Sequence, residues 1–284
     1  MIEHRNRATG WQHAKRSGHE NESILEELML NDVDVQQYFL ERIGKLEQTI
    51  VNIDIGGLHE KNVPCVFYGE TTKSKSDMYI TLSDGSHYNI SIKKSLSGQV
   101  YLIGATRFIN GFEIQYNKII PNRIKRAIYL FWGYSDDVSE IVDSIGTKRA
   151  YEFRKHRLVA DTLKIYDKTL YEDLVQWFVD NMYDIADFCF SKGLARDEQD
   201  WATIIWYKNE LGENQVDSIF KIDELCALLQ NAASTGTFYG RVGGGTTIQL
   251  PFGFVQWHSP TKKIPGDMQF HHNYDKIQEL VGDE

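Results

Sequence analysis

The sequence predicts a mixed fold of helices and strands, an α/β (α+β) class, and three observations support this. Residues 77–93 alternate polar and apolar side chains around a glycine-containing turn, which is typical of an antiparallel hairpin. Residues 158–190 repeat large apolar side chains every three or four positions, which predicts helices with one buried face. Six glycines lie within the eighteen positions 236–253, which favours loops and hairpins over helix.

Other elements follow from the same patterns in chain order. Residues 1–16 are polar and predict a partly ordered arm, and apolar periodicity predicts helices at 18–30, 31–49 and 124–132. Residues 150–155 are also expected to be helical, and Asp223 is expected to cap a helix that continues to residue 231. Short strands are expected at 50–55, 63–68, 100–103, and at 201–207 with 218–222 as its partner.

Composition indicates an ordinary globular protein. The chain has 284 residues, 42% hydrophobic and 25% charged, so it can form one elaborate domain or two closely joined domains. It has no internal repeat or long linker, so we expect a single compact unit over residues 1–284. The longest apolar run is too short for a membrane helix, and the N-terminal residues lack the apolar core of a signal peptide. No membrane partner is therefore expected. Three widely spaced cysteines are typical of reduced thiols, which predicts a cytoplasmic protein.

The register of the hairpin decides which side chains share a face of the sheet. A two-residue loop, Asp84-Gly85, would place Asp77 opposite Ile92 and send Lys93 to the other face. A three-residue loop that begins at Ser83, with Gly85 left-handed, would instead place Asp77 opposite Ser91 with Lys93 diagonal to it. We predict the second register, because it collects the apolar side chains on one face.

That register gathers Asp77, Ser91 and Lys93 at the end of a rigid hairpin. A carboxylate in this position can hold a divalent cation. A neighbouring ammonium can position or activate a water and stabilise the charge of a phosphorane-like transition state.

These residues resemble a known family. Asp77, a turn, and Ser91-Ile92-Lys93 together resemble the PD-(D/E)xK nuclease motif, and the segment 89–95 with Ser97 and Gln99 is most similar to type II restriction endonucleases. Two positions depart from the motif: Ser76 stands where its proline would be, and Ser91 where its second acidic residue would be. The resemblance implies a central mixed β-sheet flanked by helices, with a restriction-endonuclease-like catalytic core at 17–132 and helical and strand support at 150–233.

The same resemblance implies a glutamate from a helix before the hairpin. The spacing Gly18-x-x-x-Glu22 is similar to that helix, and we favour Glu22 over Glu20 and Glu26. An alternative is that these acidic residues only interact favourably with the dipole at the N-terminal end of their helix.

The implied activity is Mg²⁺-dependent hydrolysis of phosphodiester bonds in duplex DNA at a short specific sequence, with Mn²⁺ able to substitute. Asp77, Glu22 and the carbonyl of Ile92 would bind the metal, Lys93 would orient or activate the water, and Ser91 would take the place of the absent acidic ligand. Two alternatives stay open: a decayed nuclease that binds a specific sequence, and a structure-specific repair or recombination nuclease. Palindromic targets favour a homodimer.

The segment 235–275 is predicted to recognise DNA, because long polar side chains there can reach base edges or phosphates. With the residues that follow the hairpin, the predicted DNA contacts are Lys94, Ser95, Ser97, Gln99, Arg241, Gln249, Lys262 and Lys263. Gln256 and Gln269 have the same reach. The alternative to DNA recognition is that the six glycines in 236–253 only allow neighbouring strands to approach each other closely. Residues 243–247 lack the lysine and following helix of a phosphate-binding loop, so no nucleotide cofactor is expected.

The net charge of −9 argues against indiscriminate coating of nucleic acid. Between Tyr88 and Arg126, however, seven basic residues stand against one acidic residue, whereas Thr169–Gln230 has thirteen acidic against four basic. A basic strip beside the candidate site suits local binding of a polyanion. Chance variation on a solvated surface is the alternative.

Overall fold

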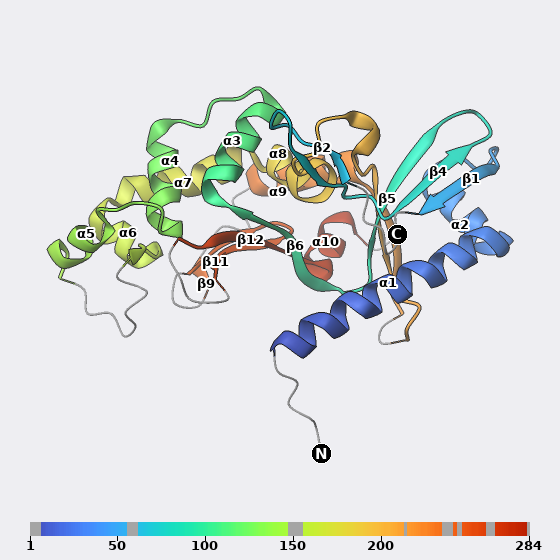
Figure 1. Ribbon diagram of the computed structural model, residues 1–284, viewed down its shortest axis with the longest axis horizontal. Helices are drawn as coiled ribbons and strands as arrows, with labels where there is room; N and C mark the ends of the chain where they lie inside the picture. The colour runs from blue at the N-terminus through green and yellow to red at the C-terminus, as the bar shows by residue number, and fades with distance from the viewer. Residues whose placement is uncertain are drawn as a thin grey trace, which may run out of the picture. The chain divides into compact units, whose positions relative to one another are not determined.

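The computed structural model describes residues 7–55, 62–146, 156–212, 215–234, 241–242, 246–259 and 265–282 (Figure 1). The chain divides into two compact units. The first comprises Met1–Cys65, Gly69–Leu96 and Phe190–Glu224, and the second comprises Val66–Tyr68, Ser97–Cys189 and Leu225–Glu284. The chain leaves the first unit after the hairpin and returns to it with two further strands of the same sheet.

The first unit is built on a five-stranded mixed sheet of order β1-β4-β5-β7-β8. The strands are β1 (Ile50–Ile55), β4 (Met78–Leu82), β5 (His87–Lys93), β7 (Ile204–Lys208) and β8 (Asp217–Lys221). Neighbouring strands are antiparallel except for β5 and β7, which are parallel. A separate two-stranded ladder joins β2 (Asn62–Pro64) to β3 (Thr71–Lys73). The unit also contains a 3₁₀ turn, Glu198–Asp200.

Helices α1 (Arg7–Asn31) and α2 (Val33–Arg42) pack on one face of this sheet. Leu25 and Met29 of α1 and Phe39 of α2 are fully buried in a cluster with Met78, Ile80, Ile90 and Trp206. The Phe39 and Trp206 rings stack with their centroids 5.7 Å apart. The expected fold class, a central mixed sheet flanked by helices, is therefore confirmed, and burial of this apolar face holds the hairpin in place.

The predicted register of the hairpin is confirmed. Met78 pairs with Ile90 and Tyr79 with Asn89, which continues to Asp77 opposite Ser91. The Leu82 N–H donates to the Ser86 carbonyl at 2.9 Å, so Ser83, Asp84 and Gly85 form a three-residue loop. Gly85 has φ +80°, a left-handed conformation that glycine adopts at no steric cost.

Several element boundaries differ from those expected. The first helix begins at Arg7 rather than residue 18, so most of the expected polar arm is helical. The second helix is shorter than 31–49: the Asp32 carboxylate caps its start by accepting from Asp34 N, and Gly44 with φ +73° follows its end. The strand expected at 63–68 spans only Asn62–Pro64. The helix expected at 150–155 lies outside the described residues.

The strand expected at 201–207 is confirmed as β7, and its antiparallel partner is β8. Asp223 lies inside the first turn of α9 (Ile222–Ser234) rather than capping it, because β8 leads directly into the helix.

The second unit combines a helical layer with a second five-stranded sheet of order β6-β12-β11-β10-β9. Its strands are β6 (Ser97–Gly104), β9 (Arg241–Val242), β10 (Thr247–Leu250), β11 (Gly253–His258) and β12 (Asp267–Asn273). Its helices, besides most of α9, are α3 (Ala105–Tyr116), α4 (Asn122–Trp132), α5 (Val138–Ser144), α6 (Ala160–Tyr166), α7 (Lys168–Asp180), α8 (Met182–Asp187) and α10 (Tyr274–Val281). A short π-helix, Phe188–Lys192, follows α8 and leads back to the first unit. No helix among the described residues is long and apolar enough to cross a membrane.

One face of the second sheet is apolar and packs against helices. Phe108 of α3 contacts Phe270 of β12 with ring centroids 5.7 Å apart and Phe188 at 5.5 Å. The expectation of strands rather than helix in the glycine-rich region holds for its described residues, and one glycine there is required sterically. A Cβ at Gly253 would lie 2.0 Å from the His271 carbonyl oxygen, so only glycine allows this approach of β11 to β12.

Candidate active site

The hairpin fixes Asp77, Ser91 and Lys93 in one cluster. The Ile92 N–H donates to Asp77 Oδ2 at 2.7 Å, and the Asp77 N–H donates to the Ile90 carbonyl at 2.8 Å. Lys93 Nζ donates to Ser91 Oγ at 2.6 Å and lies 3.5 Å from the Ile92 carbonyl oxygen. Ser91 is buried, with 1% of its surface exposed, so this network is held within the sheet.

Helix α1 brings Glu22 to the same cluster. The neighbouring residue, Asn21, is completely buried and anchors the helix to the end of β7. Asn21 Nδ2 donates to the Lys208 carbonyl at 3.0 Å, and the Glu210 N–H donates to Asn21 Oδ1 at 2.7 Å. With the helix held there, Glu22 interacts electrostatically with both Asp77 and Lys93, although it lies 55 residues before Asp77 in the chain.

The two carboxylates are electrostatically strained. Burial raises the pKa of Glu22, and the negative charge of Asp77 raises it further, while His19 and Lys93 oppose the shift. Burial also raises the pKa of Asp77, against the opposing influence of Lys93 and the Ile92 N–H. Two desolvated carboxylates that repel each other would both be stabilised by a bound cation.

This donor set fits a magnesium ion. The residues predicted to hold it, Asp77, Glu22 and the Ile92 carbonyl, all supply oxygen, which hard cations prefer. Among the described residues no group of three or more histidine, cysteine, aspartate or glutamate side chains is placed to hold a metal. Mg²⁺ is commonly bound by only one or two carboxylates, with waters and substrate phosphates completing its shell, so two are sufficient.

A divalent cation is therefore expected to stabilise the folded protein. At a concentration 100 times its dissociation constant, a bound ligand adds about 2.7 kcal/mol. Without the cation, stability should fall as the pH rises above the ordinary carboxyl pKa of about 4, because the raised pKa values favour the protonated groups in the fold. Thermal unfolding with and without Mg²⁺ measures both effects. An Asp77→Asn variant should lose the response to Mg²⁺, and an equal response in that variant would contradict the assignment.

Sequence reasoning missed two residues that position the site. His19 Nδ1 lies 3.2 Å from Glu22 Oε2 and is therefore placed to orient that carboxylate. Asn21 anchors the helix through the backbone of residues 208 and 210. The i, i+3 spacing of His19 and Glu22 could have indicated the first contact. Nothing local in the sequence indicated the second.

The predicted DNA contacts fall in both units. Lys94 and Ser95 directly follow β5 in the first unit, where Lys94 is half-buried and Ser95 is exposed. Ser97 and Gln99 lie on β6 of the second unit, and both are exposed. Lys262 and Lys263 lie outside the described residues.

Arg241 and Gln249 lie on neighbouring strands of the second sheet. Arg241 on β9 pairs through its backbone with Ile248 on β10. Gln249 of β10 accepts a hydrogen bond from Lys276 Nζ at 3.0 Å, so its amide is held by α10.

The basic residues between Arg107 and Arg126, all in the second unit, are engaged by partners within that unit. Lys125 pairs with Glu113 at 2.8 Å, Arg123 with Asp173 at 2.6 Å, and Lys118 with Asp184. Arg126 pairs with Asp137, and Arg107 stacks over the Phe67 ring at 4.7 Å. These cations are engaged by partners within their own unit, which favours a structural over a phosphate-binding role for this strip.

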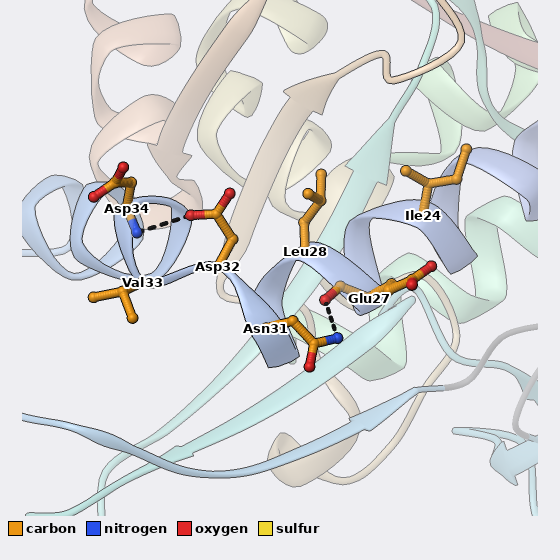
Figure 2. Close-up of a pocket in the computed structure, with 7 residues that line it drawn as sticks. All are labelled: Ile24, Glu27, Leu28, Asn31, Asp32, Val33 and Asp34. Atoms are coloured by element: carbon orange, nitrogen blue, oxygen red, sulfur yellow. Dashed lines mark hydrogen bonds between the residues drawn. The ribbon is translucent and has the colours of Figure 1, made fainter.

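A cavity of about 530 Å³ lies in the elbow between α1 and α2, away from the hairpin residues described above. Figure 2 shows its lining residues, Ile24, Glu27, Leu28, Asn31, Asp32, Val33 and Asp34. Two of its polar side chains bind the backbone: Asn31 Nδ2 donates to the Glu27 carbonyl at 2.9 Å, and the Asp34 N–H donates to Asp32 Oδ1 at 2.9 Å (Figure 2). These contacts shape the helix junction and supply no catalytic group.

Comparison with known proteins adds little to this picture. No family model matches the sequence, and no curated protein matches it. Among solved structures, the chain is similar to the restriction endonuclease MspI in complex with its cognate DNA, with 12% identity and a TM-score of 0.49. The likeness covers 88% of this chain and 83% of that chain.

Proposed function

We propose that this protein is a Mg²⁺-dependent endonuclease that hydrolyses phosphodiester bonds in duplex DNA at a short specific sequence, as type II restriction endonucleases do. The observation that carries the proposal is the meeting of Glu22, Asp77, Ser91 and Lys93 in one cluster. The resemblance to the nuclease family implied these four residues, which come from two separate segments of the sequence, the helix with Glu22 and the hairpin with Asp77, Ser91 and Lys93. The alternative, that Glu22 only interacts with the dipole at the N-terminal end of its helix, does not apply, because α1 begins at Arg7 and has no acidic residue in its first turn.

Each residue has a distinct part in the proposed reaction. Asp77 and Glu22 would hold the cation, which would supply charge stabilisation for the phosphate and lower the pKa of a bound water. The Ile92 N–H and Lys93 favour the ionised form of Asp77 against the effect of burial, and the Ile92 N–H orients its carboxylate. Lys93 orients the attacking water and stabilises the negative charge that develops on the phosphate. Ser91 holds the Lys93 ammonium through the bond at 2.6 Å.

The test is incubation of the purified protein with phage and plasmid DNA in Mg²⁺, read on a gel beside an Asp77→Ala variant. Discrete fragments with the wild-type protein that vanish in the variant are expected. Thermal unfolding of the variant serves as the control for folding. Intact DNA across several substrates, in Mg²⁺ and in Mn²⁺, would overturn the proposal.

One observation favours a second candidate function, a sequence-specific DNA-binding protein on a decayed nuclease scaffold. Ser91 replaces the second acidic residue of the motif, and only two carboxylates, Glu22 and Asp77, are placed in the cluster by the described contacts. That function predicts retention of a specific duplex without cutting in either metal. A structure-specific repair or recombination nuclease would instead cut junctions or mismatches irrespective of sequence, and branched substrates in the same assay separate it.

A further inference from the structure

The face of the second sheet opposite to its apolar core carries a row of glutamines from three strands. Gln256 of β11 is directly opposite Gln269 of β12, and its Nε2 donates to Gln269 Oε1 at 2.9 Å. Gln269 Nε2 in turn donates to Gln99 Oε1 of β6 at 2.8 Å. Gln99 lies 170 residues before Gln269, so this glutamine row exists only because β6 pairs with β12.

The row has a direction. Gln256 donates, Gln269 donates and accepts, and Gln99 accepts, so each bond favours the orientation of the next amide. The Gln99 NH₂ group and the Gln256 Oε1 atom make no hydrogen bond within the described part of the chain. Gln99 is exposed, Gln256 is half-buried and Gln269 is 9% exposed, so the row keeps a donor at one end and an acceptor at the other.

An aromatic pair continues the same face. Phe254 of β11 and His271 of β12 are directly opposite each other, and their rings stack with centroids 4.5 Å apart. Both side chains are half-buried, so apolar ring surface lies beside the amides. His271 Nε2 also lies 3.4 Å from Gln256 Nε2, which connects the pair to the row. Burial lowers the pKa of His271, which favours its neutral form.

We infer that this glutamine row reads base edges in the major groove of duplex DNA. Oriented amides match the donors and acceptors that bases present there, and apolar surface matches the methyl group of thymine. The neutral side chains suit base edges rather than phosphates, which are bound mainly by cations. Gln99 donates to a base acceptor such as N7, O6 or O4, and Gln256 Oε1 accepts from a base amino group. The inference rests on the proposed function and adds the surface that selects the sequence.

The variant that tests this inference most directly is Gln99→Glu. Its carboxylate still accepts from Gln269 Nε2, so the row and the fold are kept, but the NH₂ donors are replaced by acceptors. A duplex pool with a randomised segment is offered to the full-length wild-type and variant proteins in EDTA, and the bound duplexes are sequenced. Because EDTA removes the metal, this selection reports binding whether or not the protein cuts DNA.

The wild-type protein is expected to select a consensus sequence, and Gln99→Glu to select one altered at a single base pair. The new base should offer an amino group, as cytosine or adenine does, with roughly tenfold or greater change in discrimination there. Gln99→Ala should weaken the preference at that position without replacing it. Gln37→Glu, the same change at an exposed position on α2, should leave the consensus unchanged.

An unchanged consensus in both Gln99 variants would overturn the inference, and so would the absence of any consensus with the wild-type protein. Neither result would bear on the cleavage assay, since that assay detects cutting at any sequence. Conversely, the protein could select a consensus that Gln99→Glu alters and yet never cut DNA. That result would support the inference about the glutamine row and overturn the proposed nuclease activity.

Discussion

Replacing Lys93 by alanine is expected to lower the rate of DNA cleavage by about 10²- to 10³-fold, the range for loss of one donor that stabilises charge in the transition state. The ammonium is held by Ser91 Oγ at 2.6 Å and interacts with both Asp77 and Glu22. DNA affinity should change little, because affinity depends on many phosphate contacts and the variant removes a single cation. Single-turnover cleavage measures the rate, and fluorescence anisotropy with a labelled duplex in EDTA measures the affinity.

Two controls accompany this variant. Lys221→Ala removes a lysine from the edge strand β8 of the same sheet, where it pairs with Glu224, and should leave cleavage unchanged. A Mg²⁺ titration of Lys93→Ala should show no rescue, since removing a positive charge beside two carboxylates favours cation binding rather than weakening it. Wild-type rates in Lys93→Ala would contradict the role assigned to this lysine.

Replacing Glu22 by glutamine is expected to have two effects of opposite sign. Cleavage at a fixed Mg²⁺ concentration should fall by about 100-fold or more, because a metal ligand contributes several kcal/mol to charge stabilisation. Stability without metal should rise, because the variant no longer carries a desolvated charge next to Asp77. Cleavage rates and thermal unfolding in EDTA measure the two effects on the same samples.

Glu20→Gln is the matched control, since Glu20 lies on the same helix and is exposed. Neither its activity nor its stability should differ from the wild-type protein. Loss of cleavage together with loss of stability in Glu22→Gln would point to a structural role for this glutamate. Equal effects of the Glu20 and Glu22 variants would contradict the choice between them.

The hairpin could be predicted in detail because its information is local. Alternation from Asp77 to Lys93 identifies the strands, and Gly85 supplies the left-handed residue that a three-residue loop requires. The parity of the pairing then follows, and with it the face shared by Asp77 and Ser91. The strand at Ile50–Ile55 was predicted with the same bounds, and the predicted fold class, a mixed sheet flanked by helices, was also correct.

Helix ends and strand partners were less predictable. The N-terminal helix extends from Arg7, eleven residues earlier than its apolar periodicity suggested, because polar residues continue a helix once it has formed. The parallel pairing of β5 with β7 joins Ile90 to Ile204, and no local pattern specifies a partner so distant in sequence. The same is true of β6, which pairs with β12 to form the second sheet.

The sequence by itself therefore determined the hairpin, its register and which of its polar residues lie together at its end. Tertiary structure decided which glutamate meets Asp77, since Asn21 anchors α1 to β7 through backbone groups that no motif records. It also decided that the basic residues 118–126 are paired with acidic residues, and that Gln99 joins Gln269. The physical reason is the range of the interactions: turns and alternation act between neighbours, whereas anchoring, ion pairing and strand order depend on segments that only the folded chain brings together.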